Sequence, residues 1–458
     1  MIKKIQLILL FIFLCFSFVI AVDVPKEGDM TIIYDNPTTI VYPSFWHTPF
    51  GIHRGTAVHL KLFLGNRTYF DDPQDLACTK LMAEYGQINK DKDDWQLTVY
   101  GSNSGRGEII YNISMYALGT FGSKGSRDGQ LLNPKGIACN EYGDVYVVDS
   151  GNDRIARFYN DGKKVKFIRN IGSTGSEPGK FNNPSYAALD STGKLYVTDT
   201  NNNRIQVFSK SGGYLYSFGQ ESGLSSPQGI CVCDEGERYS GYKNNFIYVI
   251  DGNYSRIMKF DLHGVLLQSL RVNDLLGKSV KLTTLEQDYY GNIYMVDNLN
   301  SQVYKFLPDL TYITAIGTYG TKDYEFESPT GIAIYKHYGQ ILVSDKESAQ
   351  YFWIGSDATD FKVANIKTQE GPKLQFDFTV TEKSVITLQI ESPDGKIVEV
   401  CHQIVEETGK NSIAWSIPIL YKDVLKIGNI YPVYLRVMST YSSYPNIEKV
   451  LKTSILIE

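Results

Sequence analysis

Cysteine is scarce in this chain of 458 residues. There are six, and Cys15 lies in an apolar N-terminal run, which leaves five. So sparse and odd a set excludes the disulfide framework on which small secreted domains depend. Cys78 and Cys139 each follow a proline by five residues, so they occupy equivalent places in two repeats and are expected to be too far apart to bridge. Cys231 and Cys233 alternate along a strand and would make a poor chelate, so we expect buried free thiols.

An excess of positive charge is also lacking. The 45 Lys and Arg residues stand against 50 Asp and Glu, which gives a net charge of −5 and a pI near 5.8. Binding to nucleic acid or to an anionic membrane relies on clustered Lys and Arg, so the composition argues against both partners. Tyrosine, in contrast, is abundant at 33 residues. It favours strands and contact surfaces that have one dry and one wet side.

Long apolar runs are lacking after the first 20 residues. The single run, from Ile5 to Ile20, follows Lys3 and Lys4 and precedes the small residue Ala21. This pattern predicts a cleaved signal peptide over residues 1–21. An uncleaved anchor is the alternative, but the run is short against the roughly 20 residues that a membrane helix needs. We therefore expect an exported protein (periplasmic, cell-surface or secreted) with no stable membrane span after cleavage.

The chain does contain an internal repeat, in which a short strand pattern ends in a polar residue. The clear copies end at Asp149, Asp199, Asp251, Asp297 and Asp345, and a weaker copy precedes them at Tyr100. Their spacing of about fifty residues is typical of a propeller or a solenoid. Within the third unit, residues 171–219 hold four apolar strand patterns separated by turns, which is typical of a propeller blade. Because one repeat cannot bury its apolar face alone, the copies must form a single cooperative structure.

The repeat resembles the NHL repeat. Pro134 to Ala138, followed by Asp149 to Ile155, match its pattern nearly residue for residue. The resemblance implies a six-bladed β-propeller over residues 57–356. The sixth unit supplies only three strands, so residues 57–65 are predicted to add a fourth strand that closes the ring and leaves no open edge. Residues 22–56 are expected to run across the propeller as an extended arm.

The period stops after Gly355, where residues 357–367 are expected to form a linker. Alternating strand patterns then follow and predict a small β-sandwich, so the whole chain is expected to be all-β. The order of these strands, with Ser392–Gly395 as a turn and Trp415 after it, resembles the Ig-like domain of the flagellar-hook-capping (FlgD-like) type. Residues 416–426 replace the Gly-rich segment that is usual after the Trp. Residues 357–458 are thus expected to hold a linker and an Ig-like domain that acts as a spacer or an anchor.

The repeated aspartates could be taken for a calcium site, but a structural role explains them more simply. A strand-terminal Asp can cap the following turn, and an Arg five residues later can pair with it. That Arg is present in three units, as Arg154, Arg204 and Arg256. Every blade needs this turn, whereas a metal site would need only one such residue. We therefore expect no metal ion and no cofactor.

An enzyme is the alternative function: a metal-dependent lyase or hydrolase with its site in the propeller channel. Amidating lyases that resemble NHL propellers hold zinc with histidines from inner strands. None of the histidines after the signal peptide falls in a predicted innermost strand: His47, His53, His59, His263, His337 and His402. Lactonases of the gluconolactonase type need several inward carboxylates, and Glu286 is the only carboxylate expected in an innermost strand.

Binding is the favoured function. A propeller presents two loop-rich faces on a rigid scaffold. One face is expected to carry Asn152, Asn202 and Tyr254, and the other a long hairpin insertion with Tyr239 and Tyr242. Because such side chains suit protein or glycan contacts, we predict a protein or glycan ligand at a propeller face. The oligomeric state stays open, and a self-associating surface-layer component is a third possibility.

Overall fold

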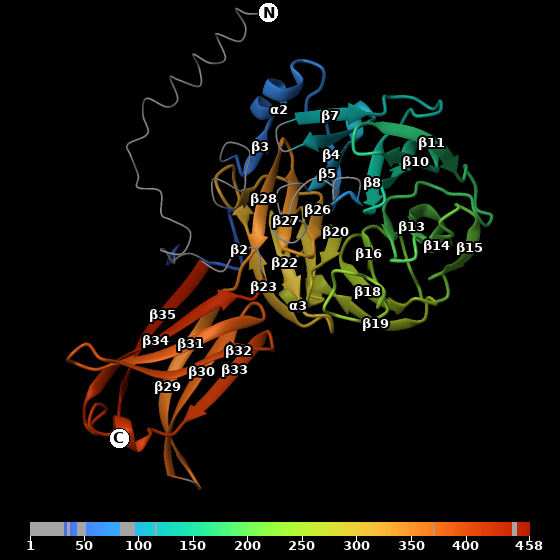
Figure 1. Cartoon of the computed structure of the whole chain (residues 1–458). Coiled ribbons are helices and arrows are strands. Elements are labelled where there is room, and N and C mark those ends of the chain that lie inside the picture. Colours follow the sequence, from blue (N-terminus) through green and yellow to red (C-terminus); the bar gives the residue numbers. More distant parts are fainter. Residues whose placement is uncertain are drawn as a thin grey trace, which may run out of the picture.

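The computed structural model describes residues 32–33, 37–43, 52–82, 97–114, 117–369, 371–441 and 447–458. The predicted signal peptide at 1–21 and much of the arm at 22–56 lie outside the described residues. The described chain is all-β apart from short helices, and it forms a ring of sheets with a two-sheet sandwich beside it (Figure 1). No helix in these ranges is long and apolar enough to cross a membrane.

The ring consists of sheets that each run in sequence order from an innermost to an outermost strand, with antiparallel pairing throughout. Their strands are β4 (Pro73–Thr79), β5 (Thr98–Asn103), β6 (Glu108–Ser114) and β7 (Ala117–Phe121); β8 (Pro134–Cys139), β9 (Asp144–Asp149), β10 (Arg154–Asn160) and β11 (Val165–Ile171); β12 (Ala187–Leu189), β13 (Leu195–Asp199), β14 (Arg204–Phe208) and β15 (Tyr214–Phe218); β16 (Ile230–Cys233), β17 (Phe246–Asp251), β18 (Arg256–Asp261) and β19 (Leu266–Arg271); β20 (Leu282–Gln287), β21 (Ile293–Asp297), β22 (Gln302–Phe306) and β23 (Tyr312–Ile316); and β26 (Ile332–Tyr335), β27 (Gln340–Asp345) and β28 (Ser348–Ile354).

The innermost strands contact one another in a closed circle, in the order β4, β8, β12, β16, β20, β26 and back to β4. The described residues therefore form a β-propeller around a central channel. Smaller elements join the sheets: α3 (Val272–Leu276), β24 (Thr318–Tyr319), β25 (Glu325–Phe326), η4 (Ser104–Arg106), η5 (Ser150–Asn152) and η6 (Thr200–Asn202).

The propeller core lies between neighbouring sheets. The second strand is almost wholly buried in every repeat unit after the first. Its tyrosine recurs at the same place as Tyr146, Tyr196, Tyr248 and Tyr294, each at most 2% exposed. These rings pack against apolar residues of the adjacent sheet. Neighbouring sheets cover both faces of these second strands. Their sequences are therefore continuous apolar runs, such as Val145 to Val148, and do not alternate between apolar and polar residues.

The prediction that residues 57–65 form a closing strand is wrong, because Ala57–Leu64 is the helix α2. Thr56 and His59 form a capping box at its start, and Gly65 ends it with a φ of 66°. Leu60 and Leu64 are the buried side chains, four residues apart on one face of the helix. In the sequence, apolar residues at every second position are typical of a strand, which explains the wrong prediction. In the structure, only Leu60 and Leu64 of this segment are buried.

The arm closes the ring instead. β2 (Ile40–Val41) and β3 (Arg54–Thr56) both pair with β28, the outermost strand of the last repeat unit. Ile40 and Val41 are 2% and 1% exposed. A segment from the N-terminal part of the chain therefore does pair with the last repeat unit, as predicted. The residues that pair, 40–41 and 54–56, precede the predicted range of 57–65.

The C-terminal part is a sandwich of two sheets. One contains β1 (Ile32–Ile33), β35 (Ile447–Leu456), β34 (Ile430–Ser439), β31 (Ser384–Glu391) and β32 (Ile397–Val405), and the other contains β29 (Ala358–Thr368), β30 (Gly371–Val380) and β33 (Gly409–Trp415), with η7 (Ile419–Tyr421) after it. Their inner faces share one apolar core. The expected linker at 357–367 is wrong, because β29 occupies it. It is a polar strand at the end of its sheet that buries only alternate residues, such as Phe361 and Val363, against the core.

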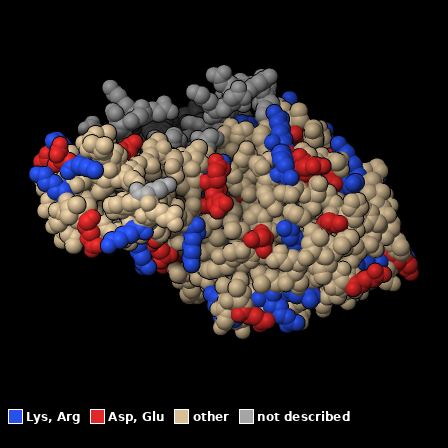
Figure 2. Space-filling view, turned by 90° about the horizontal axis from the view of Figure 1, so that it is seen from below, with Lys and Arg blue, Asp and Glu red and all other residues tan. Residues whose placement is uncertain are grey.

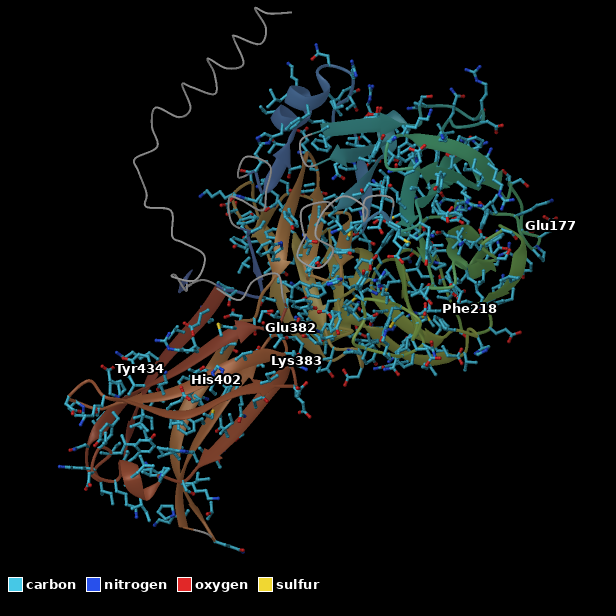
Figure 3. The ribbon with its side chains drawn as sticks, in the orientation of Figure 1. Glu177, Phe218, Glu382, Lys383, His402 and Tyr434 are labelled. Carbon is cyan, nitrogen blue, oxygen red and sulfur yellow. The ribbon has the colours of Figure 1, made fainter. Side chains whose placement is uncertain are left out.

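The sandwich is joined to the propeller by buried polar contacts. Lys305 of β22 and Glu382, between β30 and β31, form an ion pair of 2.6 Å in which both side chains are 0% exposed. Tyr441 packs its ring 5.3 Å from that of Tyr290, whose hydroxyl lies 2.6 Å from the Thr440 hydroxyl. Glu382 lies at the junction in Figure 3.

Candidate ligand pocket at the mouth of the channel

The repeated aspartates hold the propeller together at one of its faces. Asp149 accepts hydrogen bonds from the Leu132 amide at 2.6 Å, from Arg154 at 2.7 Å and from Asn152 at 2.8 Å. Asp199 repeats the arrangement, with its own Arg at 2.8 Å. The predicted pairing with Arg is therefore present. The carboxylate also reaches back to the loop before the innermost strand, which the expectation of a simple turn cap did not include.

Three of the predicted binding residues lie at this face. Asn152 and Asn202 each donate to the repeat aspartate and to a glycine carbonyl, so their amides are used by the fold. Tyr254 is half-buried with a φ of 68°, and its carbonyl accepts a hydrogen bond from the Leu282 amide. None of the three lines the cavity described next.

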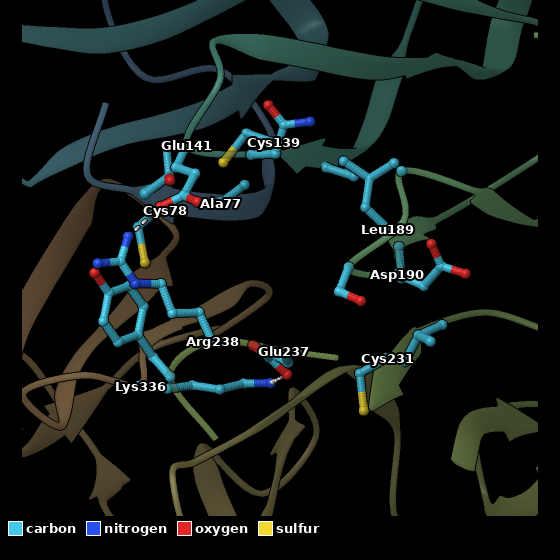
Figure 4. Close-up of a pocket in the computed structure, with 18 of the residues that line it drawn as sticks. Ala77, Cys78, Cys139, Glu141, Leu189, Asp190, Cys231, Glu237, Arg238 and Lys336 are labelled. Carbon is cyan, nitrogen blue, oxygen red and sulfur yellow. Dashed lines mark hydrogen bonds and ion pairs between the residues drawn. The ribbon is translucent and has the colours of Figure 1, made fainter. Parts of the chain in front are cut away.

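A cavity of about 500 Å³ lies at the opposite mouth of the channel. Its walls are the ends of the innermost strands and the hairpins that follow them, drawn in Figure 4. Residues that line it from different repeat units include Cys78, Cys139, Asp190, Glu237, Glu286 and Lys336. Because the units are far apart in sequence, only closure of the ring brings these side chains together.

Tyr239, predicted as a binding residue, lines this cavity. Its ring centroid is 4.3 Å from that of His337 and 6.0 Å from that of Tyr335, and the Arg238 guanidinium lies over it at 5.1 Å. Tyr242, from the same hairpin, does not line the cavity, and its ring centroid lies 6.3 Å from that of Phe246. The long hairpin thus provides an aromatic wall through only one of its two predicted tyrosines.

An ion pair crosses the cavity. Lys336 extends from the end of β26 to Glu237, with Nζ 2.6 Å from Oε2 (Figure 4). Burial lowers the pKa of Lys336, but the attraction of Glu237 and Glu286 outweighs it, so the pKa is raised and the ammonium stays charged. For Glu286, burial raises the pKa to about 7, against an opposing effect of Lys336.

Asp75 is a second carboxylate in an innermost strand, so the expectation that Glu286 is alone there is wrong. Asp75 is 5% exposed in β4 and accepts a hydrogen bond from the Ile137 amide at 3.0 Å. Burial raises its pKa to about 8. Pro73 and Cys78 have the same spacing as Pro134 and Cys139 in the next repeat unit. This equivalence could have placed residues 73–79, and with them Asp75, in an innermost strand.

Three thiols lie beside these carboxylates. Cys78, Cys139 and Cys231 are free, as predicted, and each lines the cavity. Burial raises the pKa of each thiol, so the thiols stay protonated and are poor nucleophiles. Within the described ranges, no three His, Cys, Asp or Glu side chains are grouped so as to hold a metal ion.

The fold and the channel define a β-propeller, and comparison with known proteins identifies its repeat. Residues 181–208 match the NHL repeat. The B-box type zinc finger protein ncl-1 of Caenorhabditis elegans is 33% identical over 187 residues, which cover 41% of this chain and 20% of that protein. The chain thus spans about a fifth of the length of this curated relative.

Two solved structures resemble this chain at low sequence identity. Virginiamycin B lyase from Staphylococcus aureus, crystallised with quinupristin, is 15% identical, with 56% of this chain and 76% of that chain covered and a TM-score of 0.40. A putative gluconolactonase is 13% identical, with 69% and 97% covered and a TM-score of 0.44. These values are too low to carry an argument about activity.

Proposed function

We propose that this protein is an exported, non-catalytic binding or scaffold protein that takes a protein or glycan ligand at the channel mouth, with the C-terminal sandwich as an Ig-like spacer or anchor. The observation that carries the proposal is the cavity of about 500 Å³. That volume is in the range of ligand sites, and its wall combines aromatic rings with a few polar groups, as such sites do. Export rests on the N-terminal sequence pattern.

The charges also support a binding role without nucleic acid. Figure 2 shows Lys and Arg interspersed with Asp and Glu on the face in view, without a field of one sign. The net charge is −5. Such a surface offers no clustered positive charge to attract the phosphate backbone of a nucleic acid.

The alternative, a metal-dependent lyase or hydrolase, has less support. It would need several ligands gathered in the channel, and the described residues hold no such group. Burial raises the pKa of the cavity thiols, so they are protonated and would be poor metal ligands and poor nucleophiles. We therefore favour recognition over chemistry at this cavity.

The test is an array of synthetic peptides and glycans probed with the labelled protein. The wild type should bind a subset, and Tyr239→Ala should weaken that binding at least fivefold, because aromatic anchors at interfaces usually contribute more than about 1 kcal/mol. Glu177→Gln, on an exposed loop away from the cavity (Figure 3), is the control and should bind as the wild type does. Absence of any binding, or equal binding by Tyr239→Ala, would overturn the proposal.

A further inference from the structure

The acidic side chains that line the cavity are not equivalent, because the fold uses most of them. Four have partners within it: Asp190 accepts the Thr192 and Lys194 amides, Asp234 accepts the Ser191 amide, Glu237 pairs with Lys336, and Glu141 lies 4.0 Å from Arg238. Glu286 accepts a weak bond of 3.3 Å from the amide of Gln287. Among the described residues, no cationic side chain is in ion-pair contact with Glu286.

Glu286 nevertheless lies where a ligand could reach it. It stands near the end of the innermost strand β20, surrounded by protein, and still keeps part of its surface exposed to the cavity. The groups that face it come from five other strands or hairpins: Lys336 after β26, Glu237 after β16, Asp75 and Cys78 of β4, Cys139 of β8 and Cys231 of β16. The ammonium of Lys336, which lowers the pKa of Glu286, is bonded to Glu237 instead.

The three charged residues Glu237, Lys336 and Glu286 are two carboxylates and one ammonium. Because Lys336 pairs with Glu237, the carboxylate of Glu286 has no ion-pair partner among the described residues. We call these three residues the charged row. A carboxylate in a site of low dielectric gains most from a charged partner that also donates a hydrogen bond. Tyr239 and Tyr335 also line the cavity, and the Arg238 guanidinium already lies 5.1 Å from the centroid of the Tyr239 ring, in line with the attraction of aromatic faces for cations. A single cation would balance the charged row, whereas an anion would meet the unpaired carboxylate.

We propose that the cavity binds the side-chain cation of a lysine or arginine presented by a protein partner, with Glu286 as its counter-ion and Tyr239 and Tyr335 as its walls. This inference rests on the proposed function and names the ligand class of the same site. Charge decides between the two ligand classes, because a glycan without amino groups would leave the carboxylate unpaired.

Binding of a cation at Glu286 depends on pH in a definite direction. With a pKa of about 7, Glu286 is mostly protonated at pH 6 and mostly ionised at pH 8. The cation binds the ionised form, so affinity should rise about tenfold from pH 6 to pH 8, with a proton released on binding. An uncharged ligand would show no such rise.

The experiment measures binding of two probes to the full mature chain by calorimetry and NMR at pH 6, 7 and 8. The first probe is Nα-acetyl-lysine methylamide, and the second is the same molecule with its ε-amine acetylated. We expect the charged probe to bind at least tenfold more tightly at pH 8. In Glu286→Gln this preference and the pH dependence should both disappear, whereas Glu286→Asp should keep part of each, and Glu177→Gln should keep both in full.

Circular dichroism of each variant checks that it is folded, and Tyr239→Ala serves as a second variant should Glu286→Gln not fold. Equal binding of the two probes, no binding of the charged probe, or an unchanged pH profile in Glu286→Gln would each overturn the inference. If uncharged peptides or glycans then bind in a manner sensitive to Tyr239→Ala, the proposed function survives without its cation selectivity. If no probe and no array ligand binds, both proposals fail.

Discussion

Replacing Glu382 by glutamine is expected to destabilise the protein strongly, because it leaves a buried ammonium without its counter-charge. Lys305 and Glu382 lie 2.6 Å apart and are both 0% exposed at the junction of propeller and sandwich. Burial raises the pKa of Glu382, and the attraction of Lys305 opposes that rise. Asn292 donates to the same carboxylate at 3.0 Å, so a hydrogen bond from an uncharged amide also holds Glu382 in place.

The size of the effect follows from the burial. Removal of one partner of a buried pair costs about 3–5 kcal/mol, because an uncompensated charge stays in a medium of low dielectric. A glutamine oxygen can still accept from Lys305, so we expect the lower end, about 3 kcal/mol. For a domain of about 150–250 residues that corresponds to a fall of about 6–12 °C in the melting temperature, and a larger cooperative unit would fall by less.

The assay is thermal unfolding followed by circular dichroism, together with hydrogen exchange of peptides from β22 and β31. A nearby exposed pair is the matched control. Lys383 contacts Glu406, which is 68% exposed, so Glu406→Gln should cost less than about 1 kcal/mol. The double variant Lys305→Met with Glu382→Leu removes both charges and should recover most of the stability.

Two results would contradict this expectation: a Glu382→Gln protein with the melting temperature of the wild type, or a double variant that is less stable than Glu382→Gln alone. The first result would show that the junction does not depend on the charge. The second would show that packing at the site, and not charge balance, sets the stability.

Three further predictions concern stability. Gly107→Ala should cost about 2–4 kcal/mol, because its φ is 64° and a Cβ would lie 2.5 Å from the Leu131 carbonyl oxygen; Gly277→Ala, with a φ of 63° and nothing within 4 Å, should cost only about 1 kcal/mol in the same urea titration. Ile40→Ala should cost about 2–5 kcal/mol because the buried Ile40 side chain packs in the apolar core of the last repeat unit, whereas Val58→Ala, 75% exposed, should stay within about 0.5 kcal/mol. The pKa of Glu286 is raised from 4.5 to about 7, so its contribution to the free energy of unfolding is complete below pH 4.5 and is lost as pH rises through 7. In urea unfolding from pH 4 to pH 8, the free energy of unfolding should therefore fall less in Glu286→Gln than in the wild type. An equal fall in both proteins would contradict the raised pKa of Glu286.

The candidate site was predictable only in part. The sequence singled out Tyr239, which lines the cavity, because a long tyrosine-containing hairpin interrupts a regular repeat, and that is a local signal. Asn152 and Asn202 donate to the repeat aspartates, which a polar turn in the sequence does not reveal, and their contact with a ligand stays a prediction. The cavity side chains Glu237 and Lys336 carry no local signal at all, because they come from different repeat units.

The sequence alone predicts the repeat, most of the strands within its units and the pairing of Asp with the Arg five residues later, because strand alternation and turn chemistry act over a few neighbouring residues. It also determined that the chain would be all-β. The helical state of residues 57–64 depends on tertiary packing, since the burial of Leu60 and Leu64 depends on what packs over them. The same holds for the cavity at the channel mouth and for the buried pair of Lys305 and Glu382. Their partners are far apart along the chain, and closure of the ring and docking of the sandwich bring them together.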